Sequence, residues 1–97
     1  MLKIKIEKSF KKDIERDKKS GNYSKKDFGL LKSVIISLQN QDEIDRKFKR
    51  HPLKGDMKGF ESIHVKKNDW LLIFKVDKEF LSLLMIGKHT QVYKKFA

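Results

Sequence analysis

Three histidines and one aspartate in the second half of this 97-residue chain carry the side chains best suited to moving protons. His51, His64 and His89 are the only histidines, and Asp69 lies between the last two. The imidazole ring titrates near neutral pH, so it can take up or release a proton under physiological conditions. In a strongly basic chain without cysteine, this set points to acid–base chemistry on a phosphate.

Two other interpretations of the same residues stay open. A single histidine is more often structural than catalytic, so only the whole constellation supports a functional role. Three histidines and an aspartate could also hold a metal ion, but no pair of them has a short ligand spacing, and we expect neither a metal nor a cofactor. Gly55 and Gly59 are not followed by the lysine and serine of a phosphate-binding loop, so nucleotide hydrolysis is not indicated.

The charge of the chain limits its partners. It has 24 Lys and Arg against 13 Asp and Glu, a formal net charge of +11, and on so small a body this excess favours a polyanion. Only Arg16, Arg46 and Arg50 are arginines, so most of the positive charge is on flexible ammonium groups.

The absence of cysteine excludes disulfides and thiolate chemistry and is typical of the reducing cytosol. No stretch is apolar enough for a signal peptide or a membrane span, so we expect neither secretion nor membrane insertion.

Hydrophobic periodicity predicts the elements that must position the histidines. Alternation of apolar and charged residues predicts a strand at 2–7. A thin apolar stripe predicts a largely solvated helix from Ser9 that ends before Gly21. A better-buried helix, with Ser24 and Asp27 as a capping box, is expected to follow and to run to about residue 39.

The second half predicts a sheet. Residues 40–56 are polar and contain the only proline, which is typical of a long connection. Strands are predicted at 60–65, 70–76 and 80–86, separated by short polar turns at 66–69 and 77–79, with the middle strand central in the sheet. The tail from His89 to Phe96 is expected to form a last short turn or helix. The fold class is therefore α+β: strand, helix, helix and then a three-stranded antiparallel meander. Both helices are expected on one sheet face, with the other face free for a ligand, in a single domain over residues 1–97.

A series of short motifs in the second half resembles one known family. The motifs are His51-Pro52-Leu53-Lys54-Gly55, then Phe60 ahead of His64-Val65, then Asp69-Trp70-Leu71-Leu72-Ile73-Phe74, then Gly87-Lys88-His89 and Tyr93. In this order, almost without gaps, they resemble the YafQ branch of the RelE/ParE toxin superfamily. The resemblance implies a RelE-like fold and a toxin of a type II toxin–antitoxin system in the bacterial cytoplasm. Such a toxin is an mRNA interferase, an endoribonuclease that cuts mRNA in the A site of the 70S ribosome, inhibits translation and is held inactive by its cognate antitoxin. Contact with DNA is expected only through the antitoxin complex.

The resemblance also implies roles for individual residues. The positions that match the family's acid–base residues are His51, His64, Asp69 and His89. The positions that match its aromatic residues near the RNA are Trp70 and Tyr93, although a tryptophan at the start of an apolar strand is equally typical of a core. Our hypothesis is that His89 and His51 form the main proton-transfer pair. Lys54, Lys58 and Lys88 are the candidate lysines for the RNA phosphates, with Lys88 and Lys54 the first candidates to replace a missing arginine.

Two departures from the family pattern bear on activity. Met85 and Glu61 stand where the family usually has arginines, and losing a positioned cation lowers the rate of phosphoryl chemistry. We therefore expect an endoribonuclease of reduced activity. The alternative is a catalytically weakened toxin-fold module that binds RNA or the antitoxin. A small DNA-binding domain is a weaker third interpretation, because no recognition-helix motif is present.

Overall fold

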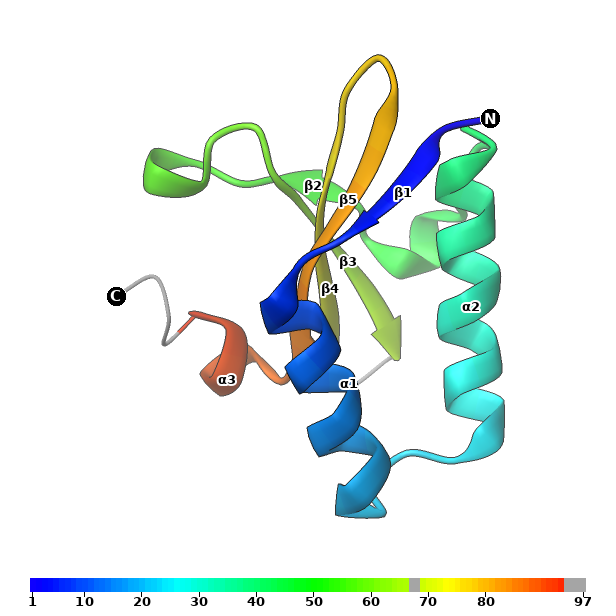
Figure 1. Ribbon diagram of the computed structural model, residues 1–97, viewed down its shortest axis with the longest axis vertical. Coiled ribbons are helices and arrows are strands. Elements are labelled where there is room, and N and C mark those ends of the chain that lie inside the picture. Colours follow the sequence, from blue (N-terminus) through cyan, green and yellow to red (C-terminus); the bar gives the residue numbers. More distant parts are fainter. Residues whose placement is uncertain (67–68, 94–97) are drawn as a thin grey trace.

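A five-stranded sheet forms the centre of the computed structural model, which describes residues 1–66 and 69–93 (Figure 1). The spatial order of the strands is β1-β5-β4-β3-β2. β1 runs parallel to β5, and the other neighbours are antiparallel. The strands are β1 (Lys3–Ile6), β2 (His51–Pro52), β3 (Glu61–Lys66), β4 (Trp70–Val76) and β5 (Phe80–Gly87). The α+β plan and the antiparallel meander are as predicted.

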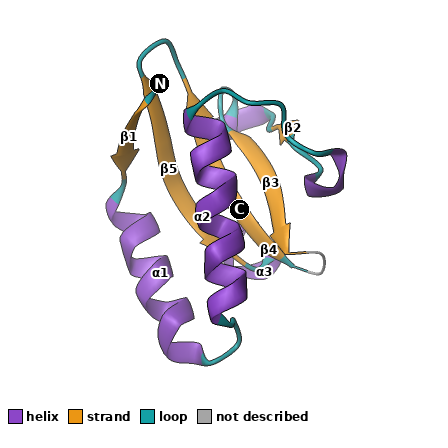
Figure 2. Ribbon diagram, turned by 90° about the vertical axis from the view of Figure 1, so that its right-hand side faces the viewer, coloured by secondary structure: helices purple, strands orange, loops and turns teal. Residues whose placement is uncertain are grey.

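Helix α2 (Lys25–Gln39) covers one face of this sheet, and α1 (Lys8–Ser20) lies at the β5 edge with its Phe10 in the core on that same face (Figure 2). Gly21 ends α1 with a left-handed φ of 74°, a conformation that favours glycine. α2 begins with the predicted capping box: the Ser24 side chain accepts from the backbone N–H of Asp27 at 3.2 Å, and the Asp27 carboxylate accepts from the Ser24 N–H at 2.9 Å. No helix within the described ranges has the length and apolar character needed to cross a membrane.

The main core lies between the two helices and the sheet. β4 is buried on both faces, as predicted for a central strand. The helices contribute apolar side chains at helical spacing, which is why their stripes were visible in the sequence. The buried members of this core are Leu2, Phe10, Leu31, Val34, Leu38, Ile63, Val65, Trp70, Leu72, Phe74, Leu81, Leu83 and Ile86.

The opposite sheet face is partly covered rather than free, which corrects the expectation for it. The short helix α3 (His89–Tyr93) packs there through its buried Val92, and the 3₁₀ turn η2 (Gly55–Met57) packs beside it. Val92 belongs to a second, smaller apolar cluster that includes Leu71, Ile73 and Met85. The cover is local, so part of this face still carries exposed polar side chains.

The long connection contains more structure than its composition predicted. Between α2 and β3 the chain forms the 3₁₀ turn η1 (Arg46–Phe48) and the two-residue strand β2, which pairs with β3. Pro52 is tolerated in β2 because a strand at the edge of a sheet does not need every backbone N–H for pairing. Two predictions extend in part beyond the described residues. They are the turn at 66–69 and the tail from His89 to Phe96.

Candidate active site

The three histidine rings lie together, although they come from three separate elements. The ring centroids of His51 and His64 are 6.4 Å apart, and those of His64 and His89 are 5.5 Å apart. In β2, His51 is directly opposite Ser62 of β3, and residues opposite each other in an antiparallel pair point to the same face. His64 is two residues further along β3 and shares that face because side chains alternate along a strand. The register of β2 on β3 therefore brings the first two histidines together.

His89 reaches the same place from the end of β5. Leu71 near the start of β4 pairs with Gly87 at the end of β5, so the residues just outside the two strands are neighbours. Asp69 precedes β4 and His89 follows β5. One carboxylate oxygen of Asp69 accepts from the backbone N–H of His89 at 2.7 Å and from the ring Nδ1 at 2.5 Å. The carboxylate thus fixes both the backbone and the ring of His89.

The Asp69 carboxyl is poised in its charged form. Partial burial works to raise its pKa, but the two hydrogen bonds from His89 and the nearby charges of His89 and Lys88 lower it more, so the pKa is below its ordinary value. At neutral pH this group is a carboxylate, which accepts hydrogen bonds and does not donate them. Its role is therefore that of an orienting acceptor behind the His89 ring.

The other two histidines have different electrostatic surroundings. Burial lowers the pKa of His64, and the positive charges of His89, Lys49 and His51 lower it further. His64 is therefore largely neutral at pH 7. The Nδ1 atom of His51 is 2.9 Å from the carbonyl oxygen of Lys49. A carbonyl only accepts, so Nδ1 is the donor, and in the neutral ring Nε2 is left with a lone pair that can take up a proton.

Tyr93 extends this group of rings. Its centroid is 5.5 Å from that of His89 with the planes at 32°, and the ring is half-exposed. It also lines a cavity of about 210 Å³ together with Leu53, Lys54, Asp56 and Met57. Of the predicted RNA-contacting residues, Tyr93 and Lys54 thus lie beside one small cavity, while Lys58 and Lys88 are exposed. Lys88 follows Gly87 directly and adjoins the Asp69–His89 pair.

A larger groove of about 560 Å³ lies on the other side of His64. Its lining residues are Leu30, Lys47, Phe48, Lys49, His64, Val65 and Lys66. Lys49 was missed by the sequence analysis, although it lies only two residues before His51. It adopts a left-handed conformation at φ 50°, and this turn brings its charge close to His64. Nothing in the residue types around Lys49 indicates that turn, so its proximity to the histidines depends on the tertiary fold.

Trp70 corrects one expected RNA contact. Its side chain is fully buried, with the ring stacked on Tyr23 at 4.2 Å and edge-on to Phe28 at 5.3 Å. Its indole N–H donates to the carboxylate of Asp17 at 2.9 Å. The ring is therefore fully enclosed and its polar atom is bonded inside the protein, so in this fold Trp70 has no exposed face to offer a nucleotide base.

The two positions at which an arginine was expected have different surroundings. Met85 is buried in the small cluster under α3, so no cation stands there. Glu61 forms a two-pronged ion pair with Arg50, at 2.8 and 3.0 Å, and the Arg50 guanidinium lies over the Phe74 ring. The carboxylate of Glu61 is therefore neutralised by an arginine next to His51.

Among the described residues, no group of three metal-binding side chains is arranged to hold an ion.

Comparison with known proteins identifies the family. The model of a bacterial toxin of type II toxin–antitoxin systems, YafQ, matches residues 2–94. The mRNA interferase toxin YafQ of Escherichia coli K12 is 34% identical over 91 residues, which cover 82% of this chain and 98% of that protein. The crystal structure of the E. coli DinJ–YafQ complex contains a chain with TM-score 0.83 and 28% identity, covering 96% of this chain and 99% of that one. A copper-bound mutant toxin from Helicobacter pylori has TM-score 0.84 and 34% identity, covering 95% and 99%. The chain therefore belongs to the YafQ family of bacterial toxins of type II toxin–antitoxin systems.

Proposed function

We propose that this toxin is a ribosome-dependent mRNA interferase that cleaves mRNA by histidine acid–base chemistry without a metal ion. The observation that carries the proposal is the grouping of His51, His64 and His89 on one sheet face, with Asp69 behind the last ring. The family and its E. coli member, named an mRNA interferase, support the reaction class. The strong positive charge suits an RNA substrate.

The proposed reaction is an in-line attack of a ribose 2′-oxygen on the neighbouring phosphorus. His51 takes the 2′-hydroxyl proton on its free Nε2, the bond from O2′ to phosphorus forms, and the bond from phosphorus to O5′ breaks. His89 donates a proton from Nε2 to the departing O5′, which leaves as a hydroxyl group, and the other product end is a 2′,3′-cyclic phosphate. The ring of His64 lies next to those of His51 and His89. Because His64 is largely neutral, its proposed role is to hydrogen-bond to the reacting phosphate, while His51 and His89 carry out the two proton transfers.

We propose that lysines supply the positive charge at the phosphate, because the guanidinium of Arg50 beside His51 is already paired with Glu61. The family arginine is replaced by the buried Met85, so we propose Lys49 beside His64 and Lys88 beside His89 as the cations that offset the developing charge. Lys54, next to the Tyr93 cavity, is placed for the adjoining nucleotide. An ammonium group on a flexible stem positions a phosphate less strictly than a guanidinium, which fits a slower enzyme.

The cognate antitoxin is the proposed protein partner, and residues 1–97 are proposed to act as a single toxin domain in the bacterial cytoplasm. The E. coli YafQ structure in complex with DinJ supports this type of partner. An acidic antitoxin segment is the natural complement to a surface of charge +11. Any contact with DNA is proposed to be made through that complex.

The decisive experiment is induction of the toxin in bacteria followed by mapping of mRNA 5′ ends. Wild type should arrest growth and produce new ends within translated codons, whereas His89→Ala should do neither. Thr90→Ala, an exposed neighbour, is the matched control and should behave as wild type. In vitro, cleavage should require translating ribosomes and should persist with a chelator selective for transition metals in Mg²⁺ buffer. Equal cleavage of free RNA, or full activity of His89→Ala, would contradict the proposal.

A toxin-fold module that binds without cutting is the second candidate. The buried Met85 in place of an arginine favours it, because the site then lacks its usual fixed cation. In that case growth arrest should survive His89→Ala, and no new mRNA ends should appear with either protein.

A further inference from the structure

Helix α1 completes the edge of the sheet where strand β1 stops. β1 pairs with β5 only as far as Ile6 opposite Leu83. Beyond that point no strand within residues 1–66 and 69–93 lies beside β5 on this edge, and α1 runs along it instead (Figure 2). The Ser9 hydroxyl in the first turn of α1 donates to the carbonyl of Leu84. Side chains of a helix thus satisfy backbone groups that a neighbouring strand would otherwise pair.

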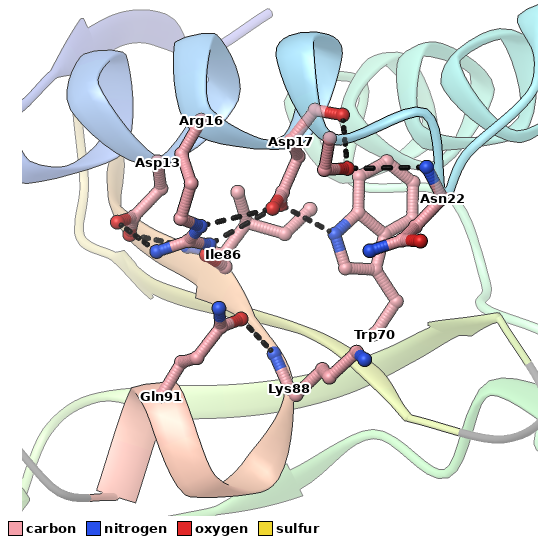
Figure 3. Close-up of polar contacts among 9 residues, drawn as sticks. Asp13, Arg16, Asp17, Asn22, Trp70, Ile86, Lys88 and Gln91 are labelled. Atoms are coloured by element: carbon pink, nitrogen blue, oxygen red, sulfur yellow. Dashed lines mark hydrogen bonds and ion pairs between the residues drawn. The ribbon is translucent and has the colours of Figure 1, made fainter.

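The next turns of α1 carry two buried carboxylates, Asp13 and Asp17, which are bridged by the partly exposed Arg16 (Figure 3). Arg16 donates to Asp13 at 2.9 Å and to Asp17 at 3.0 Å. The backbone N–H of Ile86 donates to Asp13 at 3.1 Å, and the Ile86 carbonyl accepts from Arg16 at 2.8 Å. Asp17 also accepts from the indole of Trp70 at 2.9 Å. We call these three side chains the α1 clamp, because they hold the end of β5 and the start of β4 at once.

The strand residues that the α1 clamp binds, Trp70 and Ile86, are close in sequence to the Asp69–His89 pair. Asp69 directly precedes Trp70, and His89 lies three residues after Ile86. Between them, Gly87 passes so close to α1 that an added Cβ would lie 2.9 Å from Arg16 Nη2 and 2.9 Å from the side-chain oxygen of Gln91. That oxygen also accepts from the backbone N–H of Lys88 at 2.9 Å, so the turn into α3 is fixed directly beside Gly87 (Figure 3).

Stability alone gives little reason for this arrangement. Removing two carboxylates from water, with a guanidinium that is itself only partly exposed, is costly, and apolar residues of the same volume often hold elements together at least as well. What a charged and hydrogen-bonded group adds is a fixed geometry, since each bond has a preferred length and direction. The geometry fixed here is the relative position of two strand ends, from which the two partners of one short hydrogen bond project.

We propose that Asp13, Arg16 and Asp17 are positioning residues for the Asp69–His89 pair. This rests on the proposed function, in which His89 donates a proton to the leaving group. The clamp sets the distance between the chain before Trp70 and the chain after Ile86, and that distance decides whether one Asp69 oxygen can accept both bonds from His89.

The test removes the hydrogen bond between the indole of Trp70 and the carboxylate of Asp17, which joins the α1 clamp to β4, by changing either partner. Trp70→Phe keeps an aromatic ring in the stack but loses the indole donor, and Asp17→Leu loses the acceptor. Each should lower kcat for ribosome-dependent cleavage about tenfold to a hundredfold with KM changed less than about twofold, because misplacement of a catalytic group lowers kcat selectively. Asp17→Asn keeps an acceptor for the indole and should restore most of kcat. The control, Val34→Ala, weakens the core of α2 away from the clamp and should leave kcat unchanged.

A second readout needs neither RNA nor ribosomes. NMR titration of the Asp69 carboxyl in the free protein reports its hydrogen bonds to His89, because these hold its pKa below the ordinary value. In Trp70→Phe and Asp17→Leu the pKa should rise toward that value, and in Val34→Ala it should not. If the clamp variants retain the low pKa and the kcat of Val34→Ala, the clamp is structural only and the proposal is overturned.

The two readouts separate this proposal from the proposed function. A wild-type protein that does not cleave RNA contradicts the function, and the titration still decides whether the clamp positions Asp69. Arg16→Lys guards against loss of folding in the other variants. The lysine keeps a positive charge between the carboxylates of Asp13 and Asp17 but lacks the paired N–H donors of the guanidinium. It should therefore raise the pKa of Asp69 less than Asp17→Leu does.

Discussion

His89 donates two hydrogen bonds to a single oxygen of Asp69, from its backbone N–H at 2.7 Å and from its ring Nδ1 at 2.5 Å. The backbone bond holds the first residue of α3, and the ring bond selects the rotamer of the imidazole. Since Nδ1 is occupied, Nε2 on the opposite side of the ring is the nitrogen that can exchange a proton with a substrate. The same carboxylate therefore sets both the position and the protonation pattern of the proposed acid.

Asp69→Asn tests this pair with little change in shape. The amide cannot balance positive charge on the ring and can present an N–H to Nδ1, which reverses the direction of the bond. We expect kcat for mRNA cleavage to fall about a hundredfold, the lower end of the range for acid–base catalysis, with a small change in KM. The measurement is single-turnover cleavage on programmed ribosomes. Asp77→Asn is the control, because Asp77 also accepts two N–H groups on one oxygen, both of them from the backbone and both in the β4–β5 turn. Equal losses in both variants would contradict a specific role for Asp69.

The pH dependence of cleavage should reflect His64. Burial and then the charges of His89, Lys49 and His51 lower its pKa, so the neutral ring persists to a lower pH than the ordinary value of about 6.5 would allow. If neutral His64 is needed, its contribution to activity is complete above that lowered pKa and is lost as the pH drops through it. Lys49→Met removes one of the charges that lower the pKa, so the acidic limb of kcat should move to higher pH.

The measurements are kcat against pH and the NMR titration of His64. Lys78→Met, on the exposed β4–β5 turn, should move neither. A His64 resonance that shifts while the kcat limb stays in place would show that another group limits the rate at low pH.

Local features of this fold could be predicted from the sequence because their causes are local. The capping box of Ser24 and Asp27 and the left-handed Gly21 depend on residues within a few positions of each other, and the structure has both. The three main strands were visible because a buried strand needs a run of apolar and β-branched residues. The two-residue strand at His51 was not visible, since its pairing with β3 is set by residues ten positions away.

The charged face of α1 shows what a pattern leaves open. Asp13 and Asp17 have the spacing of a solvated helix face, and that helix was expected to be largely solvated. Both are buried, because the edge of β5 and the indole of Trp70 supply donors from more than fifty residues away. Sequence periodicity records which residues are polar but not whether water or a strand end satisfies them. The same limit concealed Lys49 beside His64.

Asp27 should contribute to stability in a pH-dependent way. The N–H of Ser24 lowers its pKa most, burial opposes this, and Lys66 lowers it further through an ion pair at 3.1 Å. Because the folded pKa is below the unfolded one, the contribution is present above the unfolded value of about 3.9 and is lost as the pH falls through the folded pKa. Asp27→Ala should lower the free energy of unfolding by about 1 kcal/mol at pH 7, the usual cost of a lost cap.

Urea denaturation at neutral and at acidic pH measures the difference between wild type and this variant. The difference should shrink toward zero in acid. Asp42→Ala, at an exposed position in the loop after α2, should change stability little at either pH. A difference for Asp27→Ala that is as large in acid as at pH 7 would show that the charged carboxylate is not the source.

A pair of glycine substitutions should have opposite effects on stability. At Gly87 an added methyl group meets Arg16 and Gln91 at 2.9 Å each, in a place where both side chains are already hydrogen-bonded. Gly87→Ala should therefore destabilise the protein by about 1–3 kcal/mol, the usual cost of overpacking. At Gly29, within α2, an added Cβ has nothing within 4 Å, and alanine should stabilise the helix by about 0.5–1 kcal/mol. Thermal and urea unfolding of both variants measures the two signs. If Gly87→Ala is tolerated as well as Gly29→Ala, then the ends of the Arg16 and Gln91 side chains move aside at no cost, and their hydrogen bonds at this point are not what fixes the end of β5.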